Sequence, residues 1–372
     1  MSLAKFRATD FRNFENLDLD FSPEMNFIVG NNGSGKTSLL EAIFYLSHGR
    51  SFNTGYHHKV VRFEQDNFVL SGDVLRTENG IESKVKLGLR RYRNSDIEIR
   101  VDGQGDKKIS SLAKVLPVQL ITPESFKLFF GGPKERRHFF DFGLFHVKHS
   151  FYETWLRFTR IHKHRNALLK KRPQKYNEEF EYWDGEFCRL AELITEQREQ
   201  YLTLFNSKFE ETNLNIESLL SEAEIKFSLS AGYSLEDDLL KQLKSSFYKD
   251  VKYGYTTVGP HKSDVRIKTK QRLVEDVFSR GQLKLLLYVV KLLQSNIISE
   301  HNITPIMLID DIASEVDKSN LASIFKYLQA AQETQFFITS LNRDIAGFLL
   351  NESKSHAMFH VKHGMIKQNI GI

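Results

Sequence analysis

A short glycine-rich stretch carries the clearest chemical potential in this 372-residue chain. Residues 30–37 read Gly-Asn-Asn-Gly-Ser-Gly-Lys-Thr, which matches the spacing of a phosphate-binding loop. The glycines let successive backbone N–H groups point at phosphate oxygens, while Lys36 would bridge the phosphates and Thr37 would hold Mg²⁺. We therefore predict that a nucleoside triphosphate binds through Gly30, Asn31, Asn32, Gly33, Ser34, Gly35, Lys36, Thr37 and Ser38.

Two adjacent carboxylates follow an apolar run near the end of the chain. Residues 306–311 read Ile-Met-Leu-Ile-Asp-Asp, as expected for a buried parallel strand that delivers acids to the carboxyl edge of a sheet. Asp310 would orient Mg²⁺ or its water, and Asp311 could polarise the attacking water. A helix cap is the plain structural alternative, which the phosphate-binding loop disfavours. Lys36 and Asp311 are therefore the expected catalytic residues, and Thr37 and Asp310 the expected Mg²⁺ ligands.

A third motif lies between these two, at Ser279, Gly281 and Gln282. Ser279 stands where an N-cap belongs, because leucine and valine recur at helical spacing from Leu283 to Leu293. Ser-x-Gly-Gln is a common tetrapeptide, so its weight comes from its place before the acidic strand.

The elements that must position these residues can also be read from the sequence. Residues 27–29 form a short apolar run that predicts a buried strand before the loop, and residues 38–43 continue at helical spacing after it. Residues 336–340 predict one more buried strand, which ends in the hydroxyls of Thr339 and Ser340.

The first 110 residues favour strands. Apolar and acidic residues alternate from Leu17 to Phe21, and the hairpin signals Asn79-Gly80 and Asp102-Gly103 separate later alternating runs. One of these runs, residues 84–90, is expected to expose its basic face and bury its aliphatic one.

Composition sets modest limits. The length suggests two domains or one core with a sizeable insertion, and the net charge of +5 permits an anionic partner. The single cysteine, Cys188, excludes a disulfide framework and a cysteine-rich metal site within the chain. The start carries no apolar signal core and no run of about 18 apolar residues occurs, so we expect a soluble cytoplasmic protein.

The middle of the chain predicts a second domain. Pro133 is well placed to open a helix, and helix formers dominate from there to about residue 252, with helices of about 30 residues that would reach about 45 Å. No acidic residue lies between Glu153 and Glu178, where eight basic residues fall, so a solvated helix face and a phosphate-backbone contact both stay open. We expect an ATPase lobe from 1–130 and 300–372, and a mainly helical lobe with a short arm and the Ser-x-Gly-Gln motif at 131–299.

Together the three motifs resemble those of ATP-binding-cassette (ABC) ATPases. The resemblance implies an α/β fold, an ABC-type head in which a mixed β-sheet carries the loop helix, and ATP with Mg²⁺ as ligands. It also implies a composite site, in which Ser279 and Gly281 of one subunit close over the nucleotide of a second. Gln119 is a weaker candidate for sensing Mg²⁺, since buried amides are common.

Seven sequence blocks resemble the RecF family of bacterial recombinational repair proteins, in that family's order. The resemblance implies an ATP-dependent homodimer that binds double-stranded, gapped or junction DNA near the nucleoid and works with RecR and RecO, without a membrane. Asn53 departs from the family pattern, in which we expect arginine, so a phosphate contact there is in doubt. The blocks are residues 11–14, 49–52, 119–124, 132–141, 259–264, 279–286 and 308–315.

Two alternatives within the class stay open. Heads of the SMC and Rad50 type need several hundred residues of coiled coil, whereas only 279 − 36 = 243 residues separate Lys36 from Ser279. A transporter ATPase subunit is disfavoured by the helical insertion and because Thr339 or Ser340 stands where transporters have histidine. Those enzymes also have glutamate at the position of Asp311. Aspartate is one methylene shorter and would position the attacking water less well, and a misplacement of about 1 Å can cost about a hundredfold in rate. We therefore predict slow, DNA-stimulated hydrolysis.

Overall fold

The computed structural model describes residues 1–78, 81–106, 108–213, 223–312, 318–331, 334–341 and 355–370. It separates into two compact units, one of residues 1–125 with 298–372 and the other of residues 126–297. These bounds lie close to the expected division near residues 130 and 300. In the described part of the chain, no helix has the length and apolar character needed to cross a membrane.

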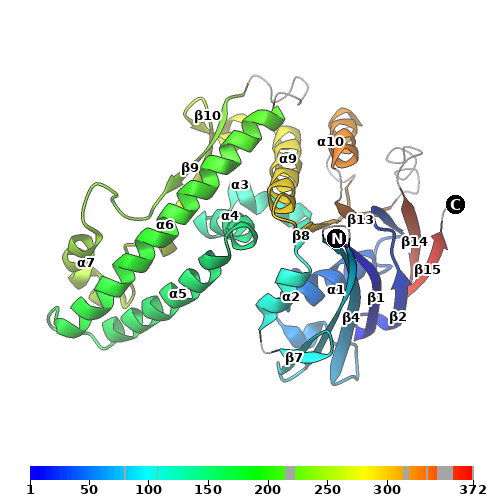
Figure 1. Ribbon diagram of the computed structural model, residues 1–372, viewed down its shortest axis with the longest axis horizontal. Helices are drawn as coiled ribbons and strands as arrows, with labels where there is room; N and C mark the ends of the chain where they lie inside the picture. Colours follow the sequence, from blue (N-terminus) through cyan, green and yellow to red (C-terminus); the bar gives the residue numbers. More distant parts are fainter. Residues whose placement is uncertain are drawn as a thin grey trace. The chain divides into compact units, whose positions relative to one another are not determined.

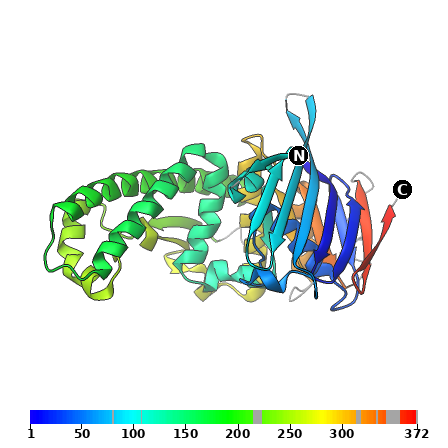
Figure 2. The ribbon, with the colours of Figure 1, turned by 90° about the horizontal axis from the view of Figure 1, so that it is seen from below.

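The first unit contains an antiparallel sheet with the strand order β2-β1-β4-β5-β6-β7. Its strands stand side by side in blue to cyan in Figure 2. Leu17, Leu19 and Phe21 are buried as the alternation predicted.

The Asp102-Gly103 turn joins β6 to β7 with φ of 51° and 78°, both positive as a two-residue hairpin turn requires. The other predicted turn, Asn79-Gly80, lies outside the described residues. The strands are β1 (Ser2–Phe11), β2 (Phe14–Asp20), β4 (Asn67–Glu78), β5 (Ile81–Tyr92), β6 (Ile97–Val101) and β7 (Gln104–Asp106).

A second sheet in the same unit has the order β15-β14-β3-β13-β12-β8. All its neighbouring strands are parallel except β14 and β15, and every residue of β3, β12 and β13 is buried. The carboxyl ends of the parallel strands therefore meet at one edge, where the phosphate-binding loop follows β3 and the two aspartates follow β12. The strands are β3 (Met25–Val29), β8 (Val118–Ile121), β12 (Ile306–Ile309), β13 (Gln335–Ser340), β14 (His356–Lys362) and β15 (Met365–Ile370).

One helix, α1 (Lys36–His48), shares a single hydrophobic core with both sheets. Leu39, Leu40 and Ile43 of α1 belong to the same buried cluster as Leu70 of the first sheet and Leu308 of the second. This packing fixes the start of α1 at the carboxyl edge of the second sheet. The unit also contains η1 (His57–Lys59), α2 (Ile109–Val115) and α10 (Lys318–Ala330), and η2 (Pro123–Phe126) reaches its boundary.

The second unit is built on helices, among which α5 and α6 lie side by side as an arm with α7 beside their ends (Figure 1). Pro133 occupies the first turn of α4, as predicted. The expected helical lobe also contains a three-stranded antiparallel sheet, β11-β10-β9, and β9 falls within the stretch expected to be helical. The elements are α3 (Lys127–Phe130), α4 (Pro133–Val147), α5 (His149–Lys170), α6 (Glu178–Asn213), β9 (Ile225–Ser230), α7 (Leu239–Tyr253), η3 (Pro260–Lys262), β10 (Asp264–Thr269), β11 (Arg272–Leu273), α8 (Val274–Val277) and α9 (Arg280–Ser299).

A buried arginine joins the three helices of the arm. Arg165 on α5 donates from Nε to Asp184 on α6 at 2.7 Å, and from Nη1 to Asp250 on α7 at 2.8 Å and to Thr256 at 2.9 Å. All four side chains are fully enclosed. This corrects the prediction for the eight basic residues between Glu153 and Glu178. One of them, Arg165, links the helices of the arm and does not face a phosphate backbone.

Candidate nucleotide-binding site

The glycines of the phosphate-binding loop are required by its path. A Cβ at Gly30 would lie 2.4 Å from the carbonyl oxygen of Val361, so no larger residue fits. Gly35 has a φ of 115°, and a Cβ there would also lie 2.8 Å from the Asn13 amide nitrogen. Gly33 adopts a φ of 74°. This backbone turns directly from β3 into α1, as the strand-loop-helix pattern predicted.

Lys36 lies across the loop at the start of α1. Its Nζ donates to the carbonyl oxygens of Gly30 at 2.7 Å and Asn31 at 3.0 Å. Burial lowers the pKa of Lys36, and the charges of Asp310 and Asp311 oppose that shift. The ammonium group is thus held between the loop and the two carboxylates, where it can meet the charge of a triphosphate.

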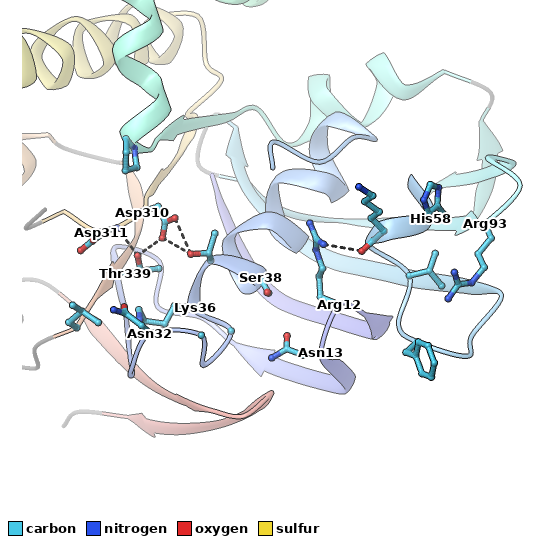
Figure 3. Close-up of a pocket in the computed structure, with 18 residues that line it drawn as sticks. Arg12, Asn13, Asn32, Lys36, Ser38, His58, Arg93, Asp310, Asp311 and Thr339 are labelled. Carbon is cyan, nitrogen blue, oxygen red and sulfur yellow. Dashed lines mark hydrogen bonds between the residues drawn. The ribbon is translucent and has the colours of Figure 1, made fainter. Parts of the chain in front are cut away.

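Three elements place oxygen ligands together at the sheet edge. The Thr37 hydroxyl donates to both carboxylate oxygens of Asp310, at 3.0 and 3.2 Å, and the Thr339 hydroxyl donates to Asp310 Oδ1 at 2.7 Å (Figure 3). A hydroxyl beside a carboxylate suits Mg²⁺, which takes few protein oxygens and completes its octahedron with phosphate oxygens and water. Within the described residues no cluster of three or more His, Cys, Asp or Glu side chains forms a metal cage. This donor set fits Mg²⁺ bound together with a nucleotide.

Asp311 is held by its backbone. Its N–H donates to the Thr339 hydroxyl at 2.8 Å, and its φ is 50°, in the left-handed region. The side chain lines the cavity beside Asp310. Thr339 therefore contacts both aspartates, as acceptor to one and donor to the other. The following Ser314-Glu315-Val316-Asp317 segment lies outside the described residues.

Ser34 supplies an additional polar group at the loop. Its Oγ is buried and has no hydrogen-bond partner in the described part of the chain. A buried hydroxyl without a partner costs free energy, which a phosphate oxygen could recover. The loop therefore offers a donor that the protein itself does not use.

Gln119 does not lie at the cavity that contains Lys36 and the two aspartates. It pairs in register with Met307 in the middle of β8, and its buried side chain does not line the cavity. Leu308 belongs to the core shared with α1, and Met307, its neighbour on the strand, points to the opposite face. Gln119 is therefore on the face away from Asp310, which does not support its expected part in sensing Mg²⁺.

The phosphate-binding residues line one end of a cavity of about 750 Å³. Lys36, Asp310, Asp311 and Thr339 lie at this end, and His58 and Arg93 lie at the other (Figure 3). The sequence motifs did not identify the second end, because its residues come from η1, from the segment after it and from the turn after β5. The residues that line the cavity beyond the loop and the sheet edge are Arg12, Asn13, His58, Lys59, Val61, Phe63, Arg93, Pro123 and Leu341.

Phe63 is the most exposed large apolar side chain of the cavity wall, at 82%. Arg93 donates from Nη2 to the Arg62 carbonyl oxygen at 2.9 Å, which keeps it next to Phe63. An exposed aromatic ring beside a guanidinium group can stack on a planar base.

The turn between β1 and β2 forms the middle of the cavity. Arg12, with a φ of 55°, donates to both carboxylate oxygens of buried Glu41 at 2.7 and 2.8 Å. Its Nη1 also donates to the Lys59 carbonyl oxygen at 2.9 Å. The Arg12 guanidinium is thus fixed by α1, where its charge contributes to the cavity. Asn53, which departs from the family pattern, does not line this cavity.

The Ser-x-Gly-Gln motif begins α9 in the second unit. The Gln282 N–H donates to the Ser279 hydroxyl at 3.3 Å, and the Ser279 N–H donates to the Gln282 side chain at 2.9 Å. This reciprocal capping box confirms the predicted N-cap. Ser279 is exposed, and the N–H groups of Arg280 and Gly281 belong to the first turn, which has no intrahelical acceptors.

Comparisons with known proteins match nearly the whole chain. The family model described as RecF/RecN/SMC N terminal domain matches residues 2–367. The chain is 42% identical over 367 residues to the DNA replication and repair protein RecF of Pseudoalteromonas translucida, covering 98% of this chain and 99% of that protein. It is 41% identical over 370 residues to the RecF protein of Aliivibrio salmonicida, covering 99% and 100%.

Solved structures agree with the fold. The recombination mediator protein RecF with ATP, from the RecFOR pathway, superposes with a TM-score of 0.85 at 24% identity, covering 99% of this chain and 97% of that one. An Smc head bound to the C-terminal winged-helix domain of ScpA gives 0.58 at 14% identity, covering 99% and 97%. These similarities confirm the predicted class, an α/β ABC-type ATPase head with an inserted helical part.

Proposed function

Because the chain belongs to the RecF family of DNA replication and repair proteins, we propose that it is an ATPase that binds and slowly hydrolyses ATP to control its attachment to DNA. The observation that carries the proposal is the hydrogen-bonded set of Thr37, Asp310 and Thr339 at the end of a glycine loop that contains Lys36. This combination suits a Mg²⁺-bound triphosphate and few other ligands.

Lys36 and the loop bind the phosphates. Lys36 Nζ, which now contacts two loop carbonyls, would exchange them for β- and γ-phosphate oxygens, and the Ser34 hydroxyl would gain a partner. Thr37 and Asp310 would hold Mg²⁺, which supplies charge neutralisation between the β- and γ-phosphates. The start of α1 adds N–H donors and the positive end of the helix dipole.

The base would lie at the opposite end of the cavity. Phe63 offers its ring for stacking, and Arg93 and His58 line that end of the cavity. Arg12, fixed by Glu41 in the middle of the cavity, places a cation beside the phosphates or ribose. Because the phosphates would lie at the Lys36 end of the cavity, the base would lie at the end lined by Arg93.

Hydrolysis would depend on Asp311 as the group that orients water. Thr339 positions both aspartates, and its hydroxyl is not a base near neutral pH. A carboxylate one methylene shorter than glutamate is expected to place water less well, so turnover should be slow. Tens of turnovers per second with saturating DNA would contradict this.

A second subunit would complete the site. The Ser279 cap and the first-turn N–H groups of Arg280 and Gly281 form an exposed helix N-terminus, which favours an anion such as a γ-phosphate. ATP would therefore join two copies of the chain, and hydrolysis would loosen them by removing that charge.

The family membership also supports a proposal for the DNA substrate and the partners. The RecF structure superposed above is that of a recombination mediator of the RecFOR pathway. We extend this to the present chain as binding to duplex and to gapped or junction DNA, together with RecR and RecO. The long arm of an SMC or Rad50 head does not suit this chain, because the longest helix among the described residues, α6, has 36 residues, about 54 Å.

Binding to a gapped duplex with ATP, ADP and no nucleotide tests the proposal, with mass determination on the same samples. ATP should increase both DNA affinity and dimer mass, and raised salt should weaken DNA binding. Asp311→Asn should keep ATP affinity and accumulate the ATP-bound dimer. A variant that hydrolyses ATP normally, or that stays strictly monomeric with ATP, would refute the proposed site.

A further inference from the structure

Two segments of the second unit that lack exposed acidic side chains lie against each other. Residues 154–177 contain no Asp or Glu, and residues 239–263 contain only Asp250, which is fully buried and bonded to Arg165. The Thr256 N–H also donates to the Asn166 side chain at 2.8 Å. The end of α5 and the length of α7 thus form one surface whose exposed charges are positive.

Exposed lysines gather on this surface. Lys249, Lys252 and Tyr253 are spaced three and four residues apart on α7, so they share one face of the helix, and all three are exposed. Lys170, at the end of α5, lies against Gly254, where a Cβ would be 3.5 Å from its Cγ. Neither these lysines nor Lys262 forms an ion pair with any described residue, in contrast to Lys244, which pairs with Glu181.

Aromatic rings stand among these lysines. The rings of Tyr253 and Tyr255 are stacked, with centroids 5.7 Å apart and planes at 21°, and remain 52% and 43% exposed. Lys262 Nζ lies 4.9 Å from the centroid of the Tyr255 ring. Tyr248, one turn before Lys252, is 70% exposed. We call Lys170, Lys249, Lys252, Tyr253, Tyr255 and Lys262 the basic-aromatic face.

Favourable interaction with the helix dipoles explains only some of the residues of the basic-aromatic face. Lys170 and Lys252 lie in the last turns of α5 and α7, where cations complement the helix dipole. That explanation does not require exposed tyrosines, which leave apolar ring surface in water. Ring faces beside unpaired cations are the combination with which proteins hold single strands, the rings stacking on bases and the cations lying along phosphates.

We propose that the basic-aromatic face binds a single-stranded segment of nucleic acid. Bases stack on Tyr253 and Tyr255, and the four lysines lie along the phosphates. The proposal rests on the DNA binding proposed above and adds a place on the second unit for the unpaired strand of a gap. It therefore assigns recognition of unpaired bases to the arm.

Fluorescence anisotropy with labelled oligo(dT), using the full chain and ATP, tests the stacking. The double variant Tyr253→Ala/Tyr255→Ala should bind about tenfold more weakly for each base that loses its ring, while Tyr253→Phe/Tyr255→Phe keeps the ring faces and should bind as the wild type does. Tyr182→Ala is the matched control, because Tyr182 is 68% exposed on α6 among Glu178, Glu179 and Glu181. Its oligo(dT) affinity should be unchanged.

Salt dependence tests the lysines independently. Lys249→Ala/Lys252→Ala should reduce the slope of log affinity against log salt by about 1.4, since each single-strand phosphate contact contributes about 0.7. Circular dichroism and the melting midpoint should match the wild type for every variant, because these side chains are exposed.

The outcomes separate this proposal from the one on which it rests. Unchanged oligo(dT) affinity in the tyrosine variant overturns the stacking face, even where the gapped duplex still binds with ATP. Competition by polyglutamate as strong as by unlabelled oligo(dT) overturns it in favour of an acidic protein partner. A wild-type chain that binds neither oligo(dT) nor gapped duplex refutes DNA binding as a whole.

Discussion

Replacing Thr339 by valine separates the shape of this buried residue from its hydrogen bonds. Valine has nearly the same volume, so the fully buried site keeps its packing and loses only the hydroxyl. That hydroxyl donates to Asp310 at 2.7 Å and accepts from the Asp311 N–H at 2.8 Å. A hydrogen bond to a charged group contributes about 1.5–3 kcal/mol and a neutral one about 0.5–1.5 kcal/mol, so the free energy of unfolding should fall by about 2–4.5 kcal/mol.

The larger effect of Thr339→Val should be on Mg²⁺ and turnover. Removing a group that orients a metal ligand typically weakens metal affinity 10- to 100-fold, and a shift of Asp311 by about 1 Å can cost about a hundredfold in rate. ATP hydrolysis measured against Mg²⁺ concentration should therefore show a higher half-saturating Mg²⁺ and a lower kcat. ATP binding in EDTA should stay within about twofold of the wild type.

Thr339→Ser is the matched control, because it keeps the hydroxyl and removes one methyl group. It should retain the Mg²⁺ dependence of the wild type. If Thr339→Val hydrolysed ATP at the wild-type rate and at the same half-saturating Mg²⁺, the hydroxyl would not position either aspartate, and the reasoning from these two hydrogen bonds would be refuted.

Three further predictions follow from individual side chains. Phe63→Ala should weaken ATP binding about tenfold while leaving tripolyphosphate binding unchanged, as measured by calorimetry, because only the base loses its stacking partner; equal losses for both ligands would contradict the placement of the base. Arg165→Met should lower the free energy of unfolding by about 3–5 kcal/mol in urea, because Asp184 and Asp250 would stay buried without their cation, whereas exposed Arg160→Met should change it by less than about 0.5 kcal/mol; equal midpoints for the two variants would argue against the link. Burial lowers the pKa of His146 from 6.5 to about 3, so below pH 6.5 the unfolded chain binds a proton that the folded chain does not. Stability should thus fall by up to about 1.4 kcal/mol per pH unit as the pH drops towards 4, and His146→Leu should reduce that slope in urea titrations; an unchanged slope would show that other groups cause the acid sensitivity.

The features predicted correctly from the sequence depend on neighbouring residues. The positive φ of Gly33 and Gly35 is a requirement of the loop's own backbone path, and Ser279 with Gln282 forms a capping box across one helical turn. The apolar run before Asp310 is buried on both faces, which its continuous hydrophobicity indicated. In each case the physical cause lies within about ten residues of the feature it explains.

The features that the sequence did not indicate depend on residues far apart in the chain. Arg165 meets Asp184 and Asp250, which lie 19 and 85 residues away, so a charge count over one segment could not tell it from its exposed neighbours. The cavity end at Phe63 is formed by a segment with no motif of its own. Gln119 was a candidate for sensing Mg²⁺ only through the resemblance to ABC ATPases, and the alternation of faces along β8 directs its side chain away from Asp310.

The sequence predicts Thr339 or Ser340 where transporter ATPases have histidine, and Thr339 contacts both aspartates. Its position at the end of β13, paired with β12 on one side and β3 on the other, brings it between the phosphate-binding loop and the aspartates. One oxygen then contacts the Asp310 carboxylate and also holds the backbone of Asp311 at a positive φ. A histidine could carry a proton near neutral pH, whereas this hydroxyl can only orient its neighbours. The slow hydrolysis proposed above would follow in part from Thr339, because its hydroxyl orients the proposed Mg²⁺ ligand and cannot carry a proton as a histidine could.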